Sequence, residues 1–241
     1  MSIAENIAAI RQKMKEAAIA AGRDPKEILL CAATKMNDTA AVRQAIAAGV
    51  DCCGENKVQE LTRKLSEDAY HGCPVHFIGH LQTNKVRQVV GKVSLIQSVD
   101  RVKLLDAIQA EAARQQLVQR VLLEINIGAE ASKSGFAPEE LPALLDKLHN
   151  YPNVSVAGLM AIPPVCHNPG DNNKFFQKIL QLSVDIKEKK YDNVSVDFLS
   201  MGMSGDYADA IAWGSPMIRL GTAIFGPRDY DKNVTSDAIS M

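Results

Sequence analysis

The chain has 241 residues, of which 46% are hydrophobic, and its 27 basic and 28 acidic side chains leave a formal net charge of -1. This balance argues against broad binding to nucleic acids or anionic membranes, because both need a basic excess. The N-terminus lacks the basic segment and apolar core of a secretory signal, and no apolar run is long enough to span a bilayer.

Cysteine usage predicts a reduced, cytoplasmic protein without a disulfide framework or a zinc site. The five cysteines are odd in number, irregularly spaced and free of a C-x-x-C motif. They are Cys31, Cys52, Cys53, Cys73 and Cys166. We interpret the adjacent pair Cys52 and Cys53 as structural.

Apolar runs and amphipathic segments alternate along the chain. Apolar residues at helical spacing predict an N-terminal helix over residues 2–21. The short apolar runs that follow are typical of parallel strands buried on both faces. These runs span residues 28–35, 50–54, 75–79, 93–99, 121–127, 154–162, 194–199 and 217–220. Helices are predicted between them over residues 38–49, 56–68, 85–90, 101–116, 138–148, 175–186 and 204–213.

This order of elements predicts an α/β fold. About eight strand–helix units in ~250 residues are typical of a (β/α)8 barrel, here with an extra N-terminal helix. A doubly wound open sheet is the alternative architecture. Because no linker or break in composition appears, we expect one domain over residues 1–241, with its core at about 26–228 and a tail at 229–241.

Lys35 ends the first predicted strand. Taken alone, this stretch is best explained by a lysine that caps a strand and reaches solvent. The functional alternative is a lysine at the edge of a cavity, where burial lowers the amine pKa and the neutral amine can form Schiff bases with carbonyls.

Active sites of (β/α)8 barrels lie where the strands end, and candidate side chains collect at those ends here. Besides Lys35 they are Glu55, Asn56, His80, Asn84, Ser98, Asp100, Glu124, Asn126, Met160, Ser200 and Arg219. Taken alone, His80 is best explained as a satisfied core or loop histidine, and Met160 as a packing residue. Arg219 lies inside an apolar strand, so it either pairs with a carboxylate such as Glu124 or Asp197 or contacts a ligand.

The loops after strands seven and eight predict a phosphate site. Ser204 lies between Gly202 and Gly205, and Gly221 is followed by Thr222. Glycine lets the backbone approach an anion, and hydroxyls add donors. The alternative is that these residues only form turns and helix caps. A lysine, an arginine and a phosphate cradle fit either pyridoxal 5′-phosphate (PLP) or a sugar phosphate in a class-I aldolase.

Seven motifs in order resemble the pyridoxal phosphate homeostasis protein family, the single-domain relatives of the alanine racemase N-terminal barrel. They are Ala33-Thr34-Lys35, Gly54-Glu55-Asn56-Lys57-Val58-Gln59-Glu60, Ile78-Gly79-His80-Leu81-Gln82-Thr83-Asn84-Lys85, Lys133-Ser134-Gly135-Phe136, Gly158-Leu159-Met160, the run from Leu199 to Asp206 and the run from Arg219 to Gly226. The resemblance covers the chain from about Ile3 to Arg228.

The resemblance implies a role for each position. Lys35 would form a Schiff base with PLP, and Ser204, Gly221 and Thr222 would hold its phosphate. Arg219 would face the pyridine nitrogen. The residues that would line the ring are Asn56, His80, Met160 and Ser200.

The resemblance also implies a PLP-binding protein in vitamin B6 homeostasis that buffers or delivers the cofactor without robust catalysis. A cation at the pyridine nitrogen disfavours its protonation and weakens the ring as an electron sink. The chain after Gly226 is also too short to supply the opposing base of a racemase domain. The alternative is a PLP-dependent amino-acid racemase or lyase. We expect a monomer whose partners are PLP and PLP-dependent apoenzymes, with no nucleic acid or membrane.

Overall fold

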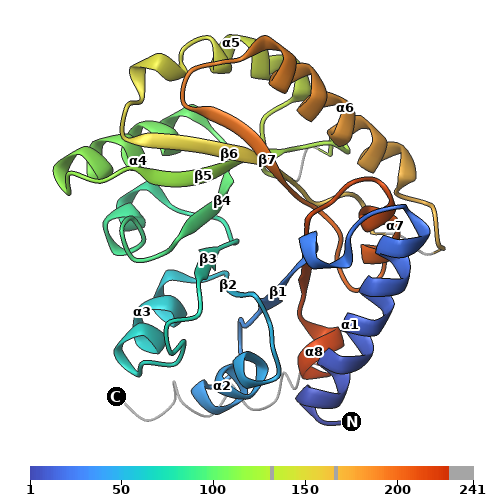
Figure 1. The fold of residues 1–241 in the computed structure, drawn as a ribbon. Coiled ribbons are helices and arrows are strands. Elements are labelled where there is room, and N and C mark those ends of the chain that lie inside the picture. Colours follow the sequence, from blue (N-terminus) through green and yellow to red (C-terminus); the bar gives the residue numbers. More distant parts are fainter. Residues whose placement is uncertain (131–132, 166–167, 228–241) are drawn as a thin grey trace.

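Eight parallel strands close into a barrel in the computed structural model, which describes residues 1–130, 133–165 and 168–227 (Figure 1). The strands are β1 (Leu29–Ala33), β2 (Cys52–Glu55), β3 (Val75–Phe77), β4 (Leu95–Val99), β5 (Gln119–Ile125), β6 (Val154–Ala161), β7 (Val194–Ser200) and β8 (Met217–Leu220). They pair in chain order, and parallel pairing of β1 with β8 closes the ring. This confirms the (β/α)8 prediction and excludes the open sheet.

Helices surround the strands. The α-helices are α1 (Ile3–Ala20), α2 (Thr39–Ala47), α3 (Val58–Ser66), α4 (Val102–Arg114), α5 (Leu141–Leu145), α6 (Asn173–Lys189), α7 (Tyr207–Ala212) and α8 (Thr222–Phe225). The 3-10 helices are η1 (Pro25–Glu27), η2 (Thr83–Gln88), η3 (Pro138–Glu140) and η4 (Leu148–Asn150). No helix of the described chain has both the length and the apolar character needed to cross a membrane.

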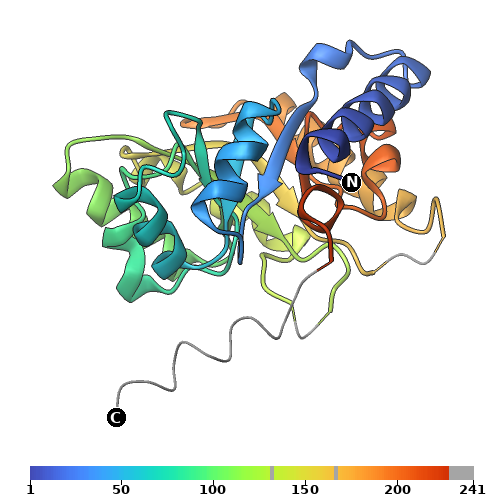
Figure 2. The ribbon, with the colours of Figure 1, turned by 90° about the horizontal axis from the view of Figure 1, so that it is seen from below.

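The extra N-terminal helix α1 is present as predicted. Ser2 and Glu5 form a reciprocal capping box at its start, which satisfies two backbone donors. Its buried stripe packs with residues of β1 and β8 in one apolar cluster. Figures 1 and 2 place α1 against α7 and α8, so this helix covers the strand pair that closes the barrel.

Side chains of each strand alternate between the barrel interior and the helical layer. On β1, Leu30 and Ala32 pack outward with residues of α1, whereas Cys31 packs inward with Cys52 and Met217. A second interior cluster contains Leu95, Leu122, Ala157 and Met160. This alternation decides which residues after the strand ends face the mouth of the barrel.

Several predicted elements have different boundaries or types. The predicted helix 85–90 is the 3-10 helix η2. The predicted helix 138–148 is broken into η3, α5 and η4. Pro142 has no backbone N–H to donate to the carbonyl of residue 138, which interrupts a continuous helix there. Helix α7 begins at Tyr207 rather than at residue 204, since Asp206 accepts a hydrogen bond from the Met203 amide and holds a turn there.

The predicted C-terminal tail, 229–241, lies outside the described residues, as do Arg228 and Cys166.

Candidate functional site

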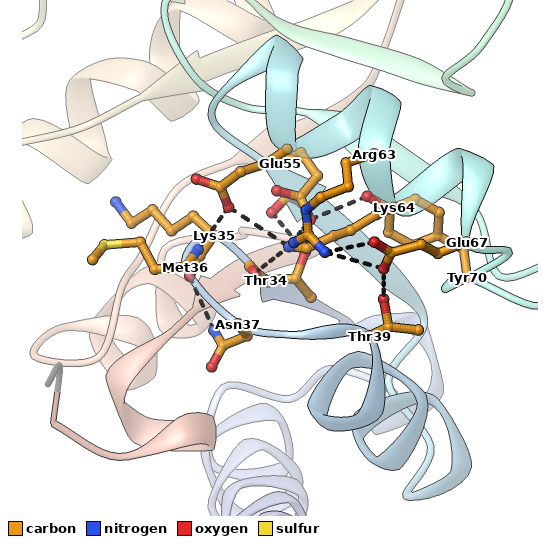
Figure 3. Close-up of polar contacts among 12 residues, drawn as sticks. Thr34, Lys35, Met36, Asn37, Thr39, Glu55, Arg63, Lys64, Glu67 and Tyr70 are labelled. Atoms are coloured by element: carbon orange, nitrogen blue, oxygen red, sulfur yellow. Dashed lines mark hydrogen bonds and ion pairs between the residues drawn. The ribbon is translucent and has the colours of Figure 1, made fainter. Parts of the chain in front are cut away.

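Lys35 follows the end of β1 on the side that faces the barrel interior. Thr34 before it faces outward, where its hydroxyl donates to the Glu55 carboxylate at 2.5 Å. Because side chains alternate, Lys35 is directed toward the mouth. Its side chain is half-buried. Figure 3 shows its amine directed away from Lys64 and Tyr70.

Glu55 belongs to the outer layer, which corrects its prediction as a residue of the barrel mouth. Its Oε1 accepts from Lys64 Nζ at 2.7 Å and from the Tyr70 hydroxyl at 3.1 Å, and the Glu55 and Lys64 side chains are fully buried (Figure 3). Lys64 also donates to the Thr34 carbonyl at 2.7 Å. Burial, with Glu55 beside it, raises the pKa of Tyr70. The pair therefore fixes the backbone immediately before Lys35.

Arg219 lies inside the barrel without a carboxylate partner among the described residues. Its Nη1 donates to Ser200 Oγ at 2.5 Å and its Nη2 donates to the Ala161 carbonyl at 3.0 Å. Burial lowers the pKa of Arg219, but a guanidinium stays charged in proteins. Asp197, one predicted partner, is exposed on β7. The structure thus gives Arg219 polar, uncharged partners instead of an ion pair.

Glu124, Met160 and Ser200 form one row across β5, β6 and β7. Met160 and Ser200 are buried, and Glu124 is half-buried. Burial, and next the charge of Asp100, raises the pKa of Glu124 to about 7, while Arg219 opposes this rise. The row therefore brings an ionisable carboxyl group, a thioether and a hydroxyl together near Arg219.

The loops after β7 and β8 meet at the mouth. Ser204 Oγ and Thr222 Oγ1 are 3.4 Å apart, and both residues are exposed. A Cβ added at Gly221 would lie 3.5 Å from the Cβ of Ala33, an ordinary contact. Packing therefore does not require glycine at 221, and the missing side chain leaves room beside the two hydroxyls.

Asn56 and His80 come from the ends of β2 and β3. Asn56 Oδ1 is buried and has no hydrogen-bond partner among the described residues. A Cβ at Gly79 would lie 2.2 Å from the Asn56 carbonyl oxygen, so this close approach requires glycine. The half-exposed His80 contacts Asp100 through Nδ1 at 3.1 Å. A buried unpaired acceptor such as Asn56 Oδ1 is costly unless a ligand or water satisfies it.

The remaining predicted residues do not join this group. Ser98 donates to the Gly79 carbonyl at 2.6 Å, and Asn126 ties the turn at Glu130 with its side chain. Asn84 is exposed on η2. Asp100 contacts Arg101 as well as His80. Ser98, Asp100 and Asn126 therefore hold the loops that shape the mouth.

Sequence reasoning missed the buried polar residues Gln97 and Lys64. Gln97 bonds Ser200 Oγ at 2.6 Å and His76 Nδ1 at 2.8 Å inside the barrel. Gln97 could have been found from sequence as a polar residue at an inward position of an otherwise apolar strand. Lys64 occupies the buried face of α3 together with Val58 and Leu61, whereas Leu65 is exposed. The spacing from Leu61 allowed either residue, so no local signal favoured the lysine.

The chain is similar to proteins that are named for pyridoxal phosphate homeostasis. It matches the family described as "Alanine racemase, N-terminal domain" over residues 2–229. It is 42% identical over 229 residues to the pyridoxal phosphate homeostasis protein of Pseudomonas aeruginosa, covering 95% of this chain and 97% of that protein. The protein of the same name from Aquifex aeolicus is 40% identical over 230 residues, covering 95% and 100%.

A solved structure has the same fold at a similar length. PipY from Synechococcus elongatus, with PLP bound, superposes with a TM-score of 0.80 at 30% sequence identity. The match covers 93% of this chain and 100% of that one.

Proposed function

Because the chain belongs to the pyridoxal phosphate homeostasis protein family, with the fold of the alanine racemase N-terminal domain, we propose that it binds PLP and serves in vitamin B6 homeostasis. The single observation that carries the proposal is that Lys35 follows β1 at the same end of the barrel as the hydroxyl pair of Ser204 and Thr222, which follow the neighbouring strands β7 and β8.

The residues at the mouth fit the chemistry of this cofactor. PLP supplies an aldehyde that condenses with amines, a dianionic phosphate and an aromatic pyridine ring. Lys35 offers the amine, and two hydroxyls with the space at Gly221 suit the phosphate. Asn56 Oδ1 is a buried acceptor that a ligand donor could satisfy. We assign the remaining wall of the ring site to His80, Met160 and Ser200, and the contact to the pyridine nitrogen to Arg219.

We further propose that the protein holds, buffers and delivers the cofactor rather than using it for robust catalysis. A charged Arg219 near a ring nitrogen disfavours protonation of that nitrogen, which weakens the ring as an electron sink. The chain would act as a cytoplasmic monomer that exchanges PLP with PLP-dependent apoenzymes. Sedimentation of the pure protein tests whether it is a monomer. The delivery role is tested with an apoenzyme, which should gain PLP faster from the loaded protein than from an equal amount of free PLP.

Binding is tested by the colour and the covalent attachment of the cofactor. Pure protein should show a visible absorption band that disappears on borohydride reduction, and mass mapping should find the reduced adduct on Lys35. Lys35→Ala should lose both signals, whereas Lys13→Ala, at an exposed position of α1, should keep them. A reduced adduct on another lysine, or an unchanged band in Lys35→Ala, would remove Lys35 from the site.

A second candidate function, a PLP-dependent amino-acid racemase or lyase, is favoured by one observation. The pKa of Glu124, raised to about 7, would let this carboxyl group exchange protons near neutral pH. Incubation with a panel of L-amino acids decides between the two. Turnover that survives re-purification and disappears in both Lys35→Ala and Glu124→Gln would show that the protein is an enzyme rather than a carrier.

A further inference from the structure

Two thiols and an imidazole meet inside the barrel, at the end opposite Lys35. Cys31 of β1, Cys52 of β2 and His76 of β3 are buried on three adjacent strands. One ligand atom from each lies within 4.8 Å of the other two. All four described cysteines, including these two, are free thiols. The proposed PLP site uses none of the three residues.

The spacing of these atoms suits a tetrahedral metal ion. Zinc binds Cys sulfur at about 2.3 Å and His nitrogen at about 2.0–2.1 Å, so two such ligands at a tetrahedral angle lie about 3.6 Å apart. The distance from Cys52 Sγ to His76 Nδ1 is 3.5 Å. Cys31 and Cys52 are register partners on neighbouring strands, which holds their side chains on one face. The Cys52 and His76 donors are therefore already spaced as ligands of one ion, and the Cys31 donor lies within 4.8 Å of both.

The cluster has an access route and a fourth potential ligand. A cavity of about 330 Å³ lies at the amino ends of the strands, and Cys52, His76 and Met217 line it. Gln97 Nε2 contacts both His76 Nδ1, at 2.8 Å, and Met217 Sδ, at 3.2 Å. The Met217 thioether therefore lies close to the donors, and the cavity also leaves room for a water ligand.

We propose that Cys31, Cys52 and His76 bind a thiophilic metal ion of the zinc class at the amino end of the barrel, with Met217 or water as the fourth ligand. Thiolate and thioether ligands select zinc or copper(I) over magnesium or calcium. On binding, each S–H bond is replaced by an S–metal bond and its proton passes to solvent. No electron is transferred. His76 Nδ1 then gives up its contact with the Gln97 amide.

The experiment uses the full, reduced chain without an affinity tag. After dialysis against Zn²⁺ and removal of the excess, elemental analysis should find about one ion per chain. X-ray absorption should find two sulfur ligands at about 2.3 Å. Cys31→Ser and Cys52→Ser should each weaken Zn²⁺ binding by on the order of 100-fold or more, measured by competition with a chromophoric chelator.

Cys53→Ser is the matched control. Cys53 is buried next to Cys52 but packs in the outer cluster, so this variant should bind Zn²⁺ like the wild type. Circular dichroism checks that each variant is folded. Wild-type protein that binds no Zn²⁺, or equal affinity in both cluster variants and the control, would overturn the proposal. If a cluster variant does not fold, the wild-type X-ray absorption spectrum still decides, since fewer than two sulfur ligands contradicts the site.

Discussion

Glu124 is the carboxyl group near the barrel mouth that should make the stability of the protein depend on pH near neutrality. Its pKa rises from the ordinary 4.5 to about 7, first because it is buried. Between these two pH values the folded chain holds a proton that the unfolded chain releases. The stabilisation is therefore complete below about pH 4.5 and is lost as the pH rises through about 7.

Glu124→Gln should remove this pH dependence, because glutamine stays neutral. In cofactor-free protein, the free energy of unfolding of the wild type should fall relative to the variant by about 2–3 kcal/mol between pH 5 and pH 8. Urea unfolding of both proteins at the two pH values measures the difference. If the free energies of unfolding of the two proteins change by the same amount between pH 5 and pH 8, Glu124 has an ordinary pKa in the folded chain.

Ser204 and Thr222 should affect cofactor retention without affecting the fold. Both are exposed, and their mutual contact is long at 3.4 Å. A hydrogen bond to a charged group contributes about 1.5–3 kcal/mol, so Ser204→Ala should weaken PLP binding by roughly 10- to 100-fold. Equilibrium dialysis measures this. Ser66→Ala, which removes an exposed hydroxyl on α3, is the control and should bind PLP normally. If Ser204→Ala and Ser66→Ala bind PLP with equal affinity, Ser204 does not contact the phosphate.

At the scale of elements, the Glu55–Lys64 pair joins three segments. Lys64 of α3 bonds Glu55 at the end of β2 and the Thr34 carbonyl beyond β1. Both side chains are fully buried, so neither charge can be solvated if its partner is removed. This contact ties the position of α3 to the backbone that carries Lys35.

Lys64→Met should destabilise the fold by about 3–5 kcal/mol, because it leaves the Glu55 carboxylate buried and unpaired. The double variant Glu55→Gln/Lys64→Met should recover part of this loss. Arg63→Ala on the same helix is the control, since its pair with Glu67 is exposed and contributes ~0.5 kcal/mol or less. Urea unfolding compares the three variants. A cost for Lys64→Met no larger than that for Arg63→Ala would mean that the pair does not hold these elements together.

At the scale of the whole molecule, polar contacts run through the barrel from one end toward the other. Arg219 bonds Ser200, Ser200 bonds Gln97, and Gln97 bonds His76. The first two residues belong to the proposed PLP site and His76 to the proposed metal site. The two sites thus share one interior hydrogen-bond chain, although they open at opposite ends of the barrel.

The barrel could be predicted from sequence because parallel strands buried on both faces give short apolar runs, such as that before Lys35. Segments whose form depends on tertiary contacts could not. The residues of η2 have helical spacing but form a 3-10 helix. The end of β1 was placed too late, at residue 35, because nothing local reveals the turn that follows, in which Met36 has a positive φ of 62°.

The candidate site could be predicted from sequence where a residue reaches the barrel mouth simply because it follows the end of a strand. Ser204 and Thr222 come together because the loops after neighbouring parallel strands share one rim. Glu55 was misplaced because a strand end does not tell which way its side chain points. The proposed metal site has no sequence motif, since its residues lie on separate strands, and sequence spacing predicted no zinc site.

Helix α1 should unfold together with the barrel rather than as an appendage. Its buried face shares one apolar cluster with β1, β8, α7 and α8, and it covers the β1–β8 pair that closes the ring. Ile10→Ala, at a position only 5% exposed, should therefore lower the free energy of unfolding by about 2–5 kcal/mol. Unfolding in urea should remain a single transition when followed by circular dichroism and by the fluorescence of Trp213, which packs against the main core cluster.

Ile19→Ala on the same helix is the matched control. Ile19 is 59% exposed, so removing its side chain should change the free energy of unfolding by ~0.5 kcal/mol or less. Both substitutions lower the intrinsic cost of helix formation equally, because alanine replaces isoleucine in each case. The difference between them therefore isolates the packing of α1 on the barrel. An early transition seen by circular dichroism but not by Trp213 fluorescence would instead show that α1 separates while the barrel stays closed.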